Sequence, residues 1–157
     1  MTKSYKYRLY PNKTQQELIQ KTFGCCRYVY NYFLDMKKRL YQEKGISLTY
    51  NQCSRELTKL KQELEWLKEP DKWALQKSLK DLDDAYQNFF KHHYNFPKFK
   101  SKKDNYKSYG TCYTNGNIKF LINKIQLPKL GKVKITDNMY PKGHILNATI
   151  SQEPDGK

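Results

Sequence analysis

Apolar residues recur at steps of three and four along the first half of the chain, a pattern typical of amphipathic helices. Thr14 and Glu17 are spaced as a capping box before the first stripe, and Gly45 is expected to end this helix. Gly24 interrupts the pattern and predicts close packing or a kink. The first stripe consists of Leu18, Thr22, Cys26, Val29, Phe33, Met36 and Leu40.

Two further helices are predicted by the same spacing. Thr49 and Gln52 form a second candidate capping box, and Pro70 separates the second helix from the third. The two stripes are Cys53, Leu57, Leu60, Leu64 and Leu67, and then Leu75, Leu79, Leu82, Tyr86 and Phe89. Three long amphipathic helices with short connections are expected to pack as a bundle.

Period-two patterns at the two ends of the chain predict strands. The opening KSYKYRLY alternates until Pro11, and short β-like runs follow residue 96. These runs are 109–114, 118–121, 124–127, 133–135 and 145–150. Asn115-Gly116 suits a type I′ hairpin, and Leu130-Gly131 is a second turn signal. Because one strand alone is unstable, the opening strand is expected to pair with these distant strands.

The predicted fold class is α+β. We expect a small basic β-barrel that is interrupted after its first strand by an inserted bundle of three or four helices. The expected parts are the first strand at 1–11, the helical bundle at 12–95 and the rest of the barrel at 96–157. The final Asp155-Gly156 starts a turn with no second arm, so the last hairpin is expected to be incomplete. We therefore expect self-association through this strand edge.

The charge of the chain is strongly positive and lies at its ends. Thirty Lys and Arg oppose fifteen Asp and Glu, a formal net charge of +15. Residues 1–34 carry +5, residues 35–95 carry +2 and residues 96–157 carry +8. A surplus of this size favours a polyanionic partner, since neutralised phosphates release condensed counterions. The alternative is a basic protein whose charge serves solubility alone.

Several other classes of function are disfavoured by the sequence. No apolar run reaches the roughly 20 residues that span a bilayer, and the opening residues lack a secretory signal, so a cytoplasmic protein is expected. Cys25, Cys26, Cys53 and Cys112 form no C-x-x-C pair, and the adjacent His92 and His93 diverge on a helix. We therefore expect neither a metal site nor a cofactor in this chain, and expect Cys26 to be a core residue.

A set of segments occurs in an order that resembles the amino-terminal portion of the TnpB (OrfB) proteins of bacterial insertion sequences. They include KYRLYPNKTQQELI, FGCCRYVYNYFL, SLTYNQCSRELTKLK, WLKEPDKWALQKSLKDLDDAYQNFF, FPKFKSKK, SYGTCYTNGNIKF, IQLPKLGKVK and ILNATIS. The resemblance implies a wedge-like barrel with an inserted recognition bundle, whose opening segment is often labelled a helix-turn-helix. It also implies a role in transposition and recombination as an RNA-guided DNA endonuclease, with DNA and a guide RNA as partners.

The resemblance implies that catalysis lies outside this chain. In the family, a RuvC-like domain with metal-binding acids and a zinc ribbon follow the point where this sequence stops. The last segment offers only Asp137, Glu153 and Asp155 as acids beyond Asp104, which is too few for a two-metal nuclease site. We therefore expect no enzymatic activity from these 157 residues alone, and expect divalent metal and structural zinc to belong to the missing part.

Four positions match the family's readers of a short DNA motif flanking the target, namely Tyr50, Lys72, Gln76 and Thr114. Gln can pair with adenine N6 and N7, Lys can donate to guanine or phosphate, and Thr or Tyr can meet a base edge. Lys72 and Gln76 are four residues apart, so one helix face presents both. Ordinary surface residues, a residue near a cap and a turn residue remain the alternatives.

Sequence-independent contacts to the nucleic-acid backbone are expected from cations interleaved with aromatic residues. The candidates are Arg8, Arg27, Lys98, Lys100, Lys102 and Lys103. Arg27 could instead pair with Asp35, and the lysine run could be a solvated charge run. For the whole chain, two alternatives to the nuclease portion stay open. One is a freestanding DNA- or RNA-binding module, and the other is a remnant of a transposase without function.

Overall fold

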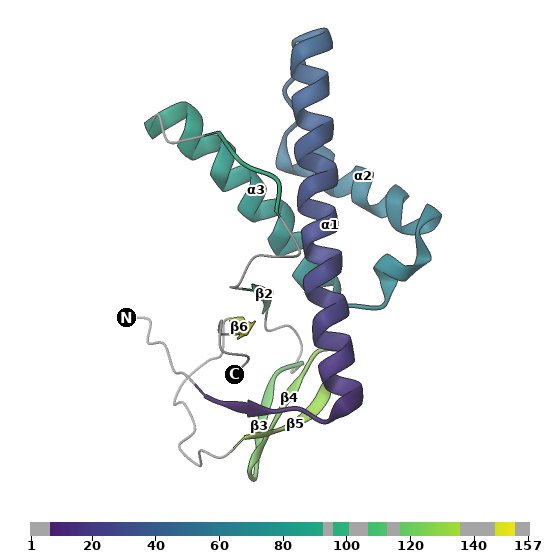
Figure 1. Ribbon diagram of the computed structural model, residues 1–157, viewed down its shortest axis with the longest axis vertical. Coiled ribbons are helices and arrows are strands. Elements are labelled where there is room, and N and C mark those ends of the chain that lie inside the picture. Colours follow the sequence, from purple (N-terminus) through teal and green to yellow (C-terminus); the bar gives the residue numbers. More distant parts are fainter. Residues whose placement is uncertain (1–6, 93–95, 101–106, 113–116, 136–146, 153–157) are drawn as a thin grey trace.

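The computed structural model describes residues 7–92, 96–100, 107–112, 117–135 and 147–152. The described residues form an α+β fold in which a long helix begins at a sheet and runs beside two further helices (Figure 1). The helices are α1 (Lys13–Lys44), α2 (Tyr50–Glu63), the 3-10 helix η1 (Glu65–Lys68) and α3 (Lys72–His92). The strands are β1 (Leu9–Tyr10), β2 (Lys107–Cys112), β3 (Lys119–Leu121), β4 (Lys124–Leu127), β5 (Gly131–Ile135) and β6 (Asn147–Gln152).

The helix ends agree with the sequence in two places and differ in one. At α2, the Gln52 N–H donates to Thr49 Oγ1 at 3.2 Å, and Gly45 ends α1 in the left-handed region with φ of 64°. The capping box expected at Thr14 and Glu17 is wrong. Asn12 Oδ1 accepts from the N–H of Gln15 at 2.8 Å instead. The helix therefore begins directly after Pro11, which places Thr14 inside its first turn.

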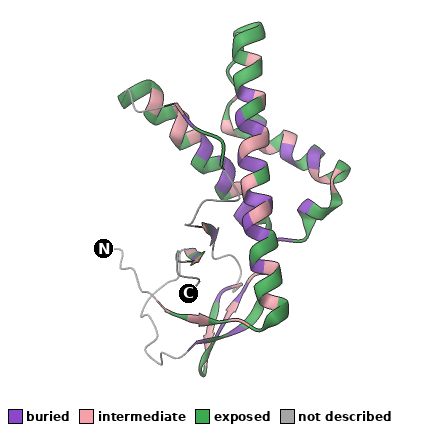
Figure 2. Cartoon of the chain, viewed as in Figure 1, coloured by how far each residue is buried: buried purple, intermediate pink, exposed green. Residues whose placement is uncertain are grey.

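The three predicted helices are confirmed, and α1 buries a wider face than its stripe predicts. Thr22, Cys26, Val29 and Phe33 are buried as expected. Ile19, Phe23, Cys25, Tyr30 and Leu34 are buried as well. Because α1 packs against α3 and also against β2, two neighbouring faces of the helix are buried. Figure 2 shows buried positions along the middle of α1, with exposed residues at its upper end.

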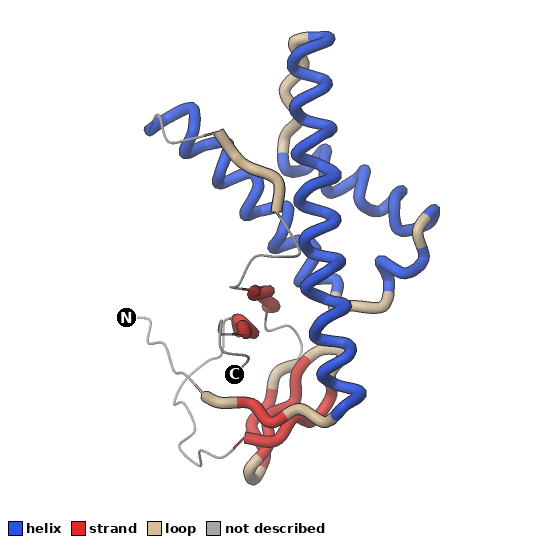
Figure 3. The backbone as a smooth tube through the Cα atoms, in the orientation of Figure 1, coloured by secondary structure: helices blue, strands red, loops and turns tan. Residues whose placement is uncertain are grey.

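The strands form two antiparallel sheets. One has the order β1-β5-β4-β3, and the other pairs β2 with β6. Leu9 lies opposite Ile135, so the expected pairing of the opening strand with the distant segment is confirmed. The expected turn at Gly131 is also confirmed, because β4 and β5 pair across it with Gly131 at φ of 76°. Figure 3 shows the larger sheet at the lower end of α1.

The closed barrel is not confirmed for the described residues. Since β1 has two residues and β3 has three, the edges of the larger sheet offer few ladder groups for closure. Asn115 and Gly116 lie outside the described residues. The strands on either side of them do not pair with each other, since β2 pairs with β6 and β3 pairs with β4. Asp155 and Gly156 lie outside the described residues.

A buried polar contact joins the helices to the strands. Asp71 and Thr111 are 5% and 2% exposed, and the Thr111 hydroxyl donates to Asp71 Oδ2. Asp71 Oδ1 also accepts from the N–H of Trp73 at 3.1 Å, which caps the start of α3. Beside it, a Cβ at Gly110 would lie 3.1 Å from Lys77 Cγ. Glycine at this position therefore allows α3 to approach β2 closely.

Candidate nucleic-acid interface

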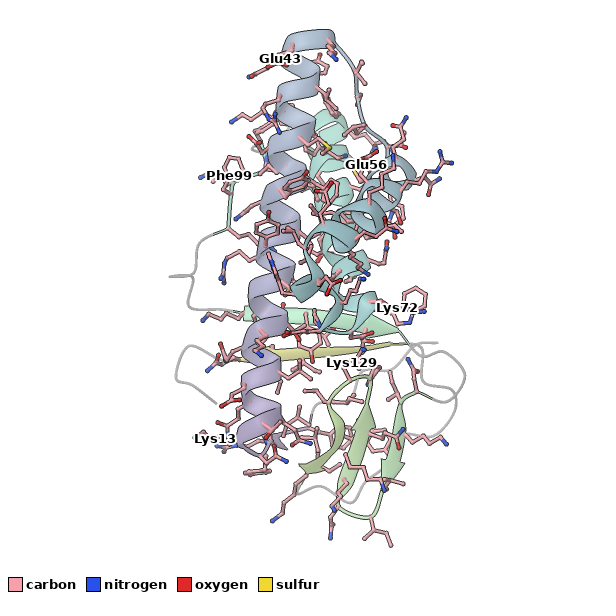
Figure 4. All side chains as sticks on the ribbon, turned by 90° about the vertical axis from the view of Figure 1, so that its right-hand side faces the viewer. Lys13, Glu43, Glu56, Lys72, Phe99 and Lys129 are labelled. Atoms are coloured by element: carbon pink, nitrogen blue, oxygen red, sulfur yellow. The ribbon has the colours of Figure 1, made fainter. Side chains whose placement is uncertain are left out.

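A hollow of about 330 Å³ lies where the helices meet the larger sheet. It is lined by the end of α2, by η1, by the start of α3 and by the β4–β5 turn. We call it the junction groove, and its lining residues are Lys61, Lys68, Pro70, Asp71, Lys72, Trp73, Asn117, Pro128 and Lys129. Figure 4 shows Lys72 at the start of α3, above Lys129 in the sheet. The groove gathers three lysines from residues 61–72 and a fourth, Lys129, from the distant β4–β5 turn, and we call these four the junction lysines.

The positive charge of the junction groove is poorly compensated. Ion pairs within the described residues involve other lysines, such as Lys59 and Lys77, and none joins a junction lysine to a described carboxylate. The one acid that lines the groove is Asp71, whose oxygens accept from Thr111 and Trp73. Partial burial lowers the pKa of Lys61, the neighbouring Lys72 lowers it further, and Asp71 opposes this shift in part. A bound anion would relieve this repulsion.

Two of the predicted motif readers lie in contact on the seam between α2 and α3. The Tyr50 hydroxyl donates to Gln76 Oε1 at 3.1 Å, and the Ser54 hydroxyl donates to the same atom at 3.2 Å. Both hydroxyls donate to the side-chain carbonyl oxygen of Gln76. The side-chain nitrogen Nε2 is therefore the group with which Gln76 can hydrogen-bond a ligand. In this arrangement Gln76 is a donor, whereas a bidentate contact with adenine would also need its oxygen.

The remaining predicted readers have different placements. Lys72 is exposed, with Nζ 5.3 Å from the centroid of the Trp73 ring, and it lies one helical turn before Gln76. Thr114 falls outside the described residues. Lys72 therefore connects the junction groove to the Tyr50–Gln76 contact along one face of α3.

The described part of the lysine-rich segment is attached to α1. Asn31 Nδ2 donates to the carbonyl of Lys100 at 2.9 Å, and the N–H of Lys100 donates to Asn31 Oδ1 at 2.7 Å. Lys38 Nζ lies 5.8 Å from the Phe99 ring centroid. Lys98 and Lys100 are exposed, and Lys100 Nζ lies 4.5 Å from the Tyr30 ring centroid. Residues 96–100 thus follow the surface of α1, while Lys102 and Lys103 lie outside the described residues.

The two predicted arginines lie on different elements. Arg8 precedes β1, is exposed and stacks at 5.4 Å on the Tyr10 ring. Arg27 is half-buried on α1. Asp35, its alternative partner, accepts instead from Arg39 Nε at 2.9 Å. Arg27 therefore has no described carboxylate partner within ion-pairing distance, and its guanidinium stays available to an external anion.

Sequence reasoning missed three of the junction lysines, namely Lys61, Lys68 and Lys129. They come from the end of α2, from η1 and from a turn in the sheet, and no sequence spacing links Lys129 to the other two. Two observations could have pointed to Lys129. It lies beside the correctly predicted turn at Leu130-Gly131, and the predicted pairing of the two chain ends brings this turn to the start of the helices. In the described residues, no three His, Cys, Asp or Glu side chains come together as a metal site requires.

Cys25, Cys26 and Cys53 are buried, as expected for Cys26. Burial raises the pKa of Cys25 to about 11 and that of Cys26 to about 12, from an ordinary value of 9.0. The neutral thiols therefore stabilise the fold below pH 9.0, and this contribution is lost as the pH rises through 11 and 12. No described helix has the length and apolar character needed to cross a membrane.

This pKa shift predicts slow alkylation of Cys26 in the native protein. Near pH 8, iodoacetamide should label Cys26 on the order of 10³-fold more slowly than in the denatured chain, because so little thiolate forms. Peptide mass mapping after timed labelling measures this at each cysteine. Equal rates in native and denatured protein would contradict the burial of this thiol.

Comparison with known proteins decides the family. A family sequence profile described as a helix-turn-helix domain, of the OrfB type, matches residues 1–45. "Putative RNA-guided DNA endonuclease InsQ" of Escherichia coli K12 is 31% identical over 152 residues, covering 95% of this chain and 37% of that protein. The chain belongs to the TnpB/OrfB family. It corresponds to the amino-terminal portion of that family's proteins.

Two other relatives differ in how much of them the chain covers. A "Putative RNA-guided DNA endonuclease" of Streptomyces pristinaespiralis is 37% identical over 103 residues, which are 64% of this chain and 26% of that protein. "Virulence protein VsdF" of Salmonella dublin is 35% identical over 113 residues, which are 65% of this chain and 95% of that protein. The chain thus spans about a third of the length of the two endonuclease relatives.

The region matched by the helix-turn-helix profile can be assigned to elements of the structure. Its described residues, 7–45, form β1 and the single continuous helix α1. Much of one face of this helix is buried against α3 and β2. In this TnpB/OrfB chain, the profile therefore covers the strand and helix that join the sheet to the bundle.

Proposed function

We propose that this chain is the nucleic-acid-binding amino-terminal part of an RNA-guided DNA endonuclease, and that its junction groove holds the duplex flanking the target. One strand of that duplex would place its phosphates on the junction lysines, with base edges facing the Tyr50–Gln76 contact. Cleavage, divalent metal and structural zinc would belong to a separate part of the endonuclease. The two sheets would form the core of the family's wedge-like barrel.

The observation that carries this proposal is the junction groove. Four lysines from separate segments converge there, and the described residues supply no ion-pairing carboxylate for them. A hollow of this charge suits phosphate oxygens, because each contact releases counterions from the nucleic acid. Gln76 lies one helical turn from Lys72, so a duplex in the groove would bring a base edge within reach of its amide nitrogen.

Gln76→Ala is expected to remove preference at one position of the duplex motif, at a cost of about 1–3 kcal/mol for the preferred base. The arrangement of its amide favours acceptor groups on that base, such as guanine O6 and N7 or thymine O4. Binding to duplexes varied one position at a time, at constant salt, measures this effect. Gln87→Ala is the matched control, since Gln87 is exposed on the same helix. Uniform weakening across all motif variants would contradict base reading by Gln76.

A second candidate is a freestanding module that binds DNA or RNA without a nuclease partner. The relative VsdF favours it, because this chain covers 95% of that protein. The two candidates differ in the reading frame that encodes the chain. A continuation with metal-binding acids supports the first candidate. Specific binding at physiological salt by the 157 residues alone supports the second.

A further inference from the structure

A second hollow, of about 400 Å³, lies between α1 and η1, and none of its lining residues lines the junction groove. Its lining residues are Gly24, Arg27, Tyr28, Asn31, Tyr32 and Trp66, and we call it the aromatic hollow. Five of these residues lie three or four positions apart and so share one face of α1, while Trp66 comes from η1. This volume is within the range of about 300–1,000 Å³ typical of small-molecule sites.

The walls of the aromatic hollow are rings that remain open to solvent. Tyr28 is 37% exposed and Trp66 is 43% exposed. Tyr28 stacks on Tyr32 with ring centroids 6.0 Å apart, and meets Trp66 edge-on at 5.0 Å. Large aromatic residues that hold one another in place and stay exposed offer a pre-formed surface for a flat ligand.

The floor of the aromatic hollow is Gly24, and packing does not require glycine there. A Cβ at this position would have Arg27 Nη2 as its nearest neighbour, at an ordinary contact distance of 3.6 Å. Glycine inside a helix lowers its stability relative to alanine. The sequence therefore keeps an unfavourable residue where a methyl group would fit, and the missing side chain deepens the hollow.

Two cationic residues, Arg27 and Lys100, lie at the aromatic hollow. Arg27 lines it and has no described carboxylate partner within ion-pairing distance. Asn31 also lines it, and its side chain holds the backbone of Lys100 through two hydrogen bonds. The lysine-rich segment thus passes the rim of the hollow. This combination of a flat aromatic surface and adjacent cations matches the two halves of an unpaired nucleotide, a base and its phosphate.

We propose that the aromatic hollow binds an unpaired base of a single-stranded RNA, with the neighbouring phosphates on Arg27 and the Lys98–Lys100 segment. The inference rests on the proposed function, which supplies an RNA partner. It adds a base-binding site that is separate from the junction groove. A base within a duplex has its faces covered by its neighbours, so the site selects single strands.

Fluorescence of Trp66 tests this directly. The chain has two tryptophans, Trp66 and Trp73, so Trp73→Phe leaves Trp66 as the reporter. A short oligouridine RNA is expected to quench Trp66. An abasic ribose-phosphate oligomer of the same length and charge is expected to leave it unchanged, because no base stacks. Equal quenching and affinity with the abasic oligomer would overturn the proposal.

Affinity measurements separate stacking from charge. Tyr32→Leu is expected to weaken oligouridine binding about 5- to 150-fold, the range for loss of one stacked base, without changing the slope of log K against log salt. Arg27→Gln is expected to reduce that slope by about 0.7. Tyr41→Leu is the control, because Tyr41 is 60% exposed near the far end of α1. A slope change in Tyr32→Leu, or equal weakening in Tyr41→Leu, would overturn the proposal.

Gly24→Ala distinguishes loss of the binding site from loss of folding. It is expected to keep or raise the melting temperature, because alanine favours the helix, while it weakens oligouridine binding by filling the floor of the hollow. Unchanged RNA affinity in this variant would count against the hollow. Oligothymidine that binds as tightly as oligouridine would overturn the assignment to RNA. Duplex binding through the junction groove, measured in Gly24→Ala and Tyr32→Leu, should stay unchanged. Its failure in the parent protein would instead overturn the proposed function.

Discussion

Replacement of all four junction lysines by glutamine is expected to weaken duplex DNA binding on the order of 10³-fold near 0.1 M salt. Each phosphate contact contributes about 0.9 to the slope of log K against log salt, so the slope should fall by up to about 3.6. Glutamine keeps most of the side-chain length, and the variant should keep the melting temperature of the parent protein. Fluorescence anisotropy with a duplex probe over a salt series measures both quantities.

The matched control removes the same charge from elsewhere. Lys13, Lys44, Lys59 and Lys91 are exposed and do not line the junction groove, so their joint replacement by glutamine also lowers the formal net charge from +15 to +11. If the groove is the duplex site, the control variant should retain most of the slope. Equal loss in both variants would show that net charge, rather than the junction groove, governs binding.

Local features of the sequence predicted much of the fold. The capping box at Thr49 and Gln52, the left-handed Gly45 and the stripes of the three helices depend on residues within a few positions of one another. The pairing of β1 with β5 was also predictable, because an isolated strand needs a partner and β-like segments occur only near the other end of the chain. The α+β class followed from these two observations together.

The junction groove could not be predicted in the same way. Lys61 and Lys129 lie close only because β1 carries the start of α1 to the sheet while Pro70 turns the chain into α3. The barrel was overestimated for a related reason. Sequence gives the number of strands and their turns, but the partner of β2 is set by tertiary contacts, which favoured β6 over β3. Among the predicted readers, the contact of Tyr50 with Gln76 depends on the tertiary packing of the start of α2 against the start of α3.

Asp71→Ala is expected to lower the free energy of unfolding by about 2–4 kcal/mol. Loss of the cap on α3 costs about 1 kcal/mol. Loss of the acceptor for the buried Thr111 hydroxyl costs a further 1–3 kcal/mol, roughly, because this group then lacks a partner. Denaturation by urea, followed by circular dichroism, measures the change. With Thr111→Val in a double-mutant cycle, the coupling energy should be about 0.5–3 kcal/mol, and a coupling near zero would contradict the contact.

Two variants of Asp71 distinguish the effect of its buried hydrogen bonds from the effect of its charge on the junction groove. Asp71→Ala and Asp71→Asn remove the same negative charge from beside the junction lysines, and electrostatics alone predicts tighter duplex binding by both. Asparagine keeps an acceptor for the N–H of Trp73 and a group that can bond to Thr111, whereas alanine keeps neither. We therefore expect Asp71→Asn to bind duplex DNA at least as tightly as the parent, and Asp71→Ala to bind more weakly than Asp71→Asn well below its melting temperature. Equal affinities for the two variants would mean that the groove tolerates loss of the link between α3 and β2, and that charge alone determines binding there.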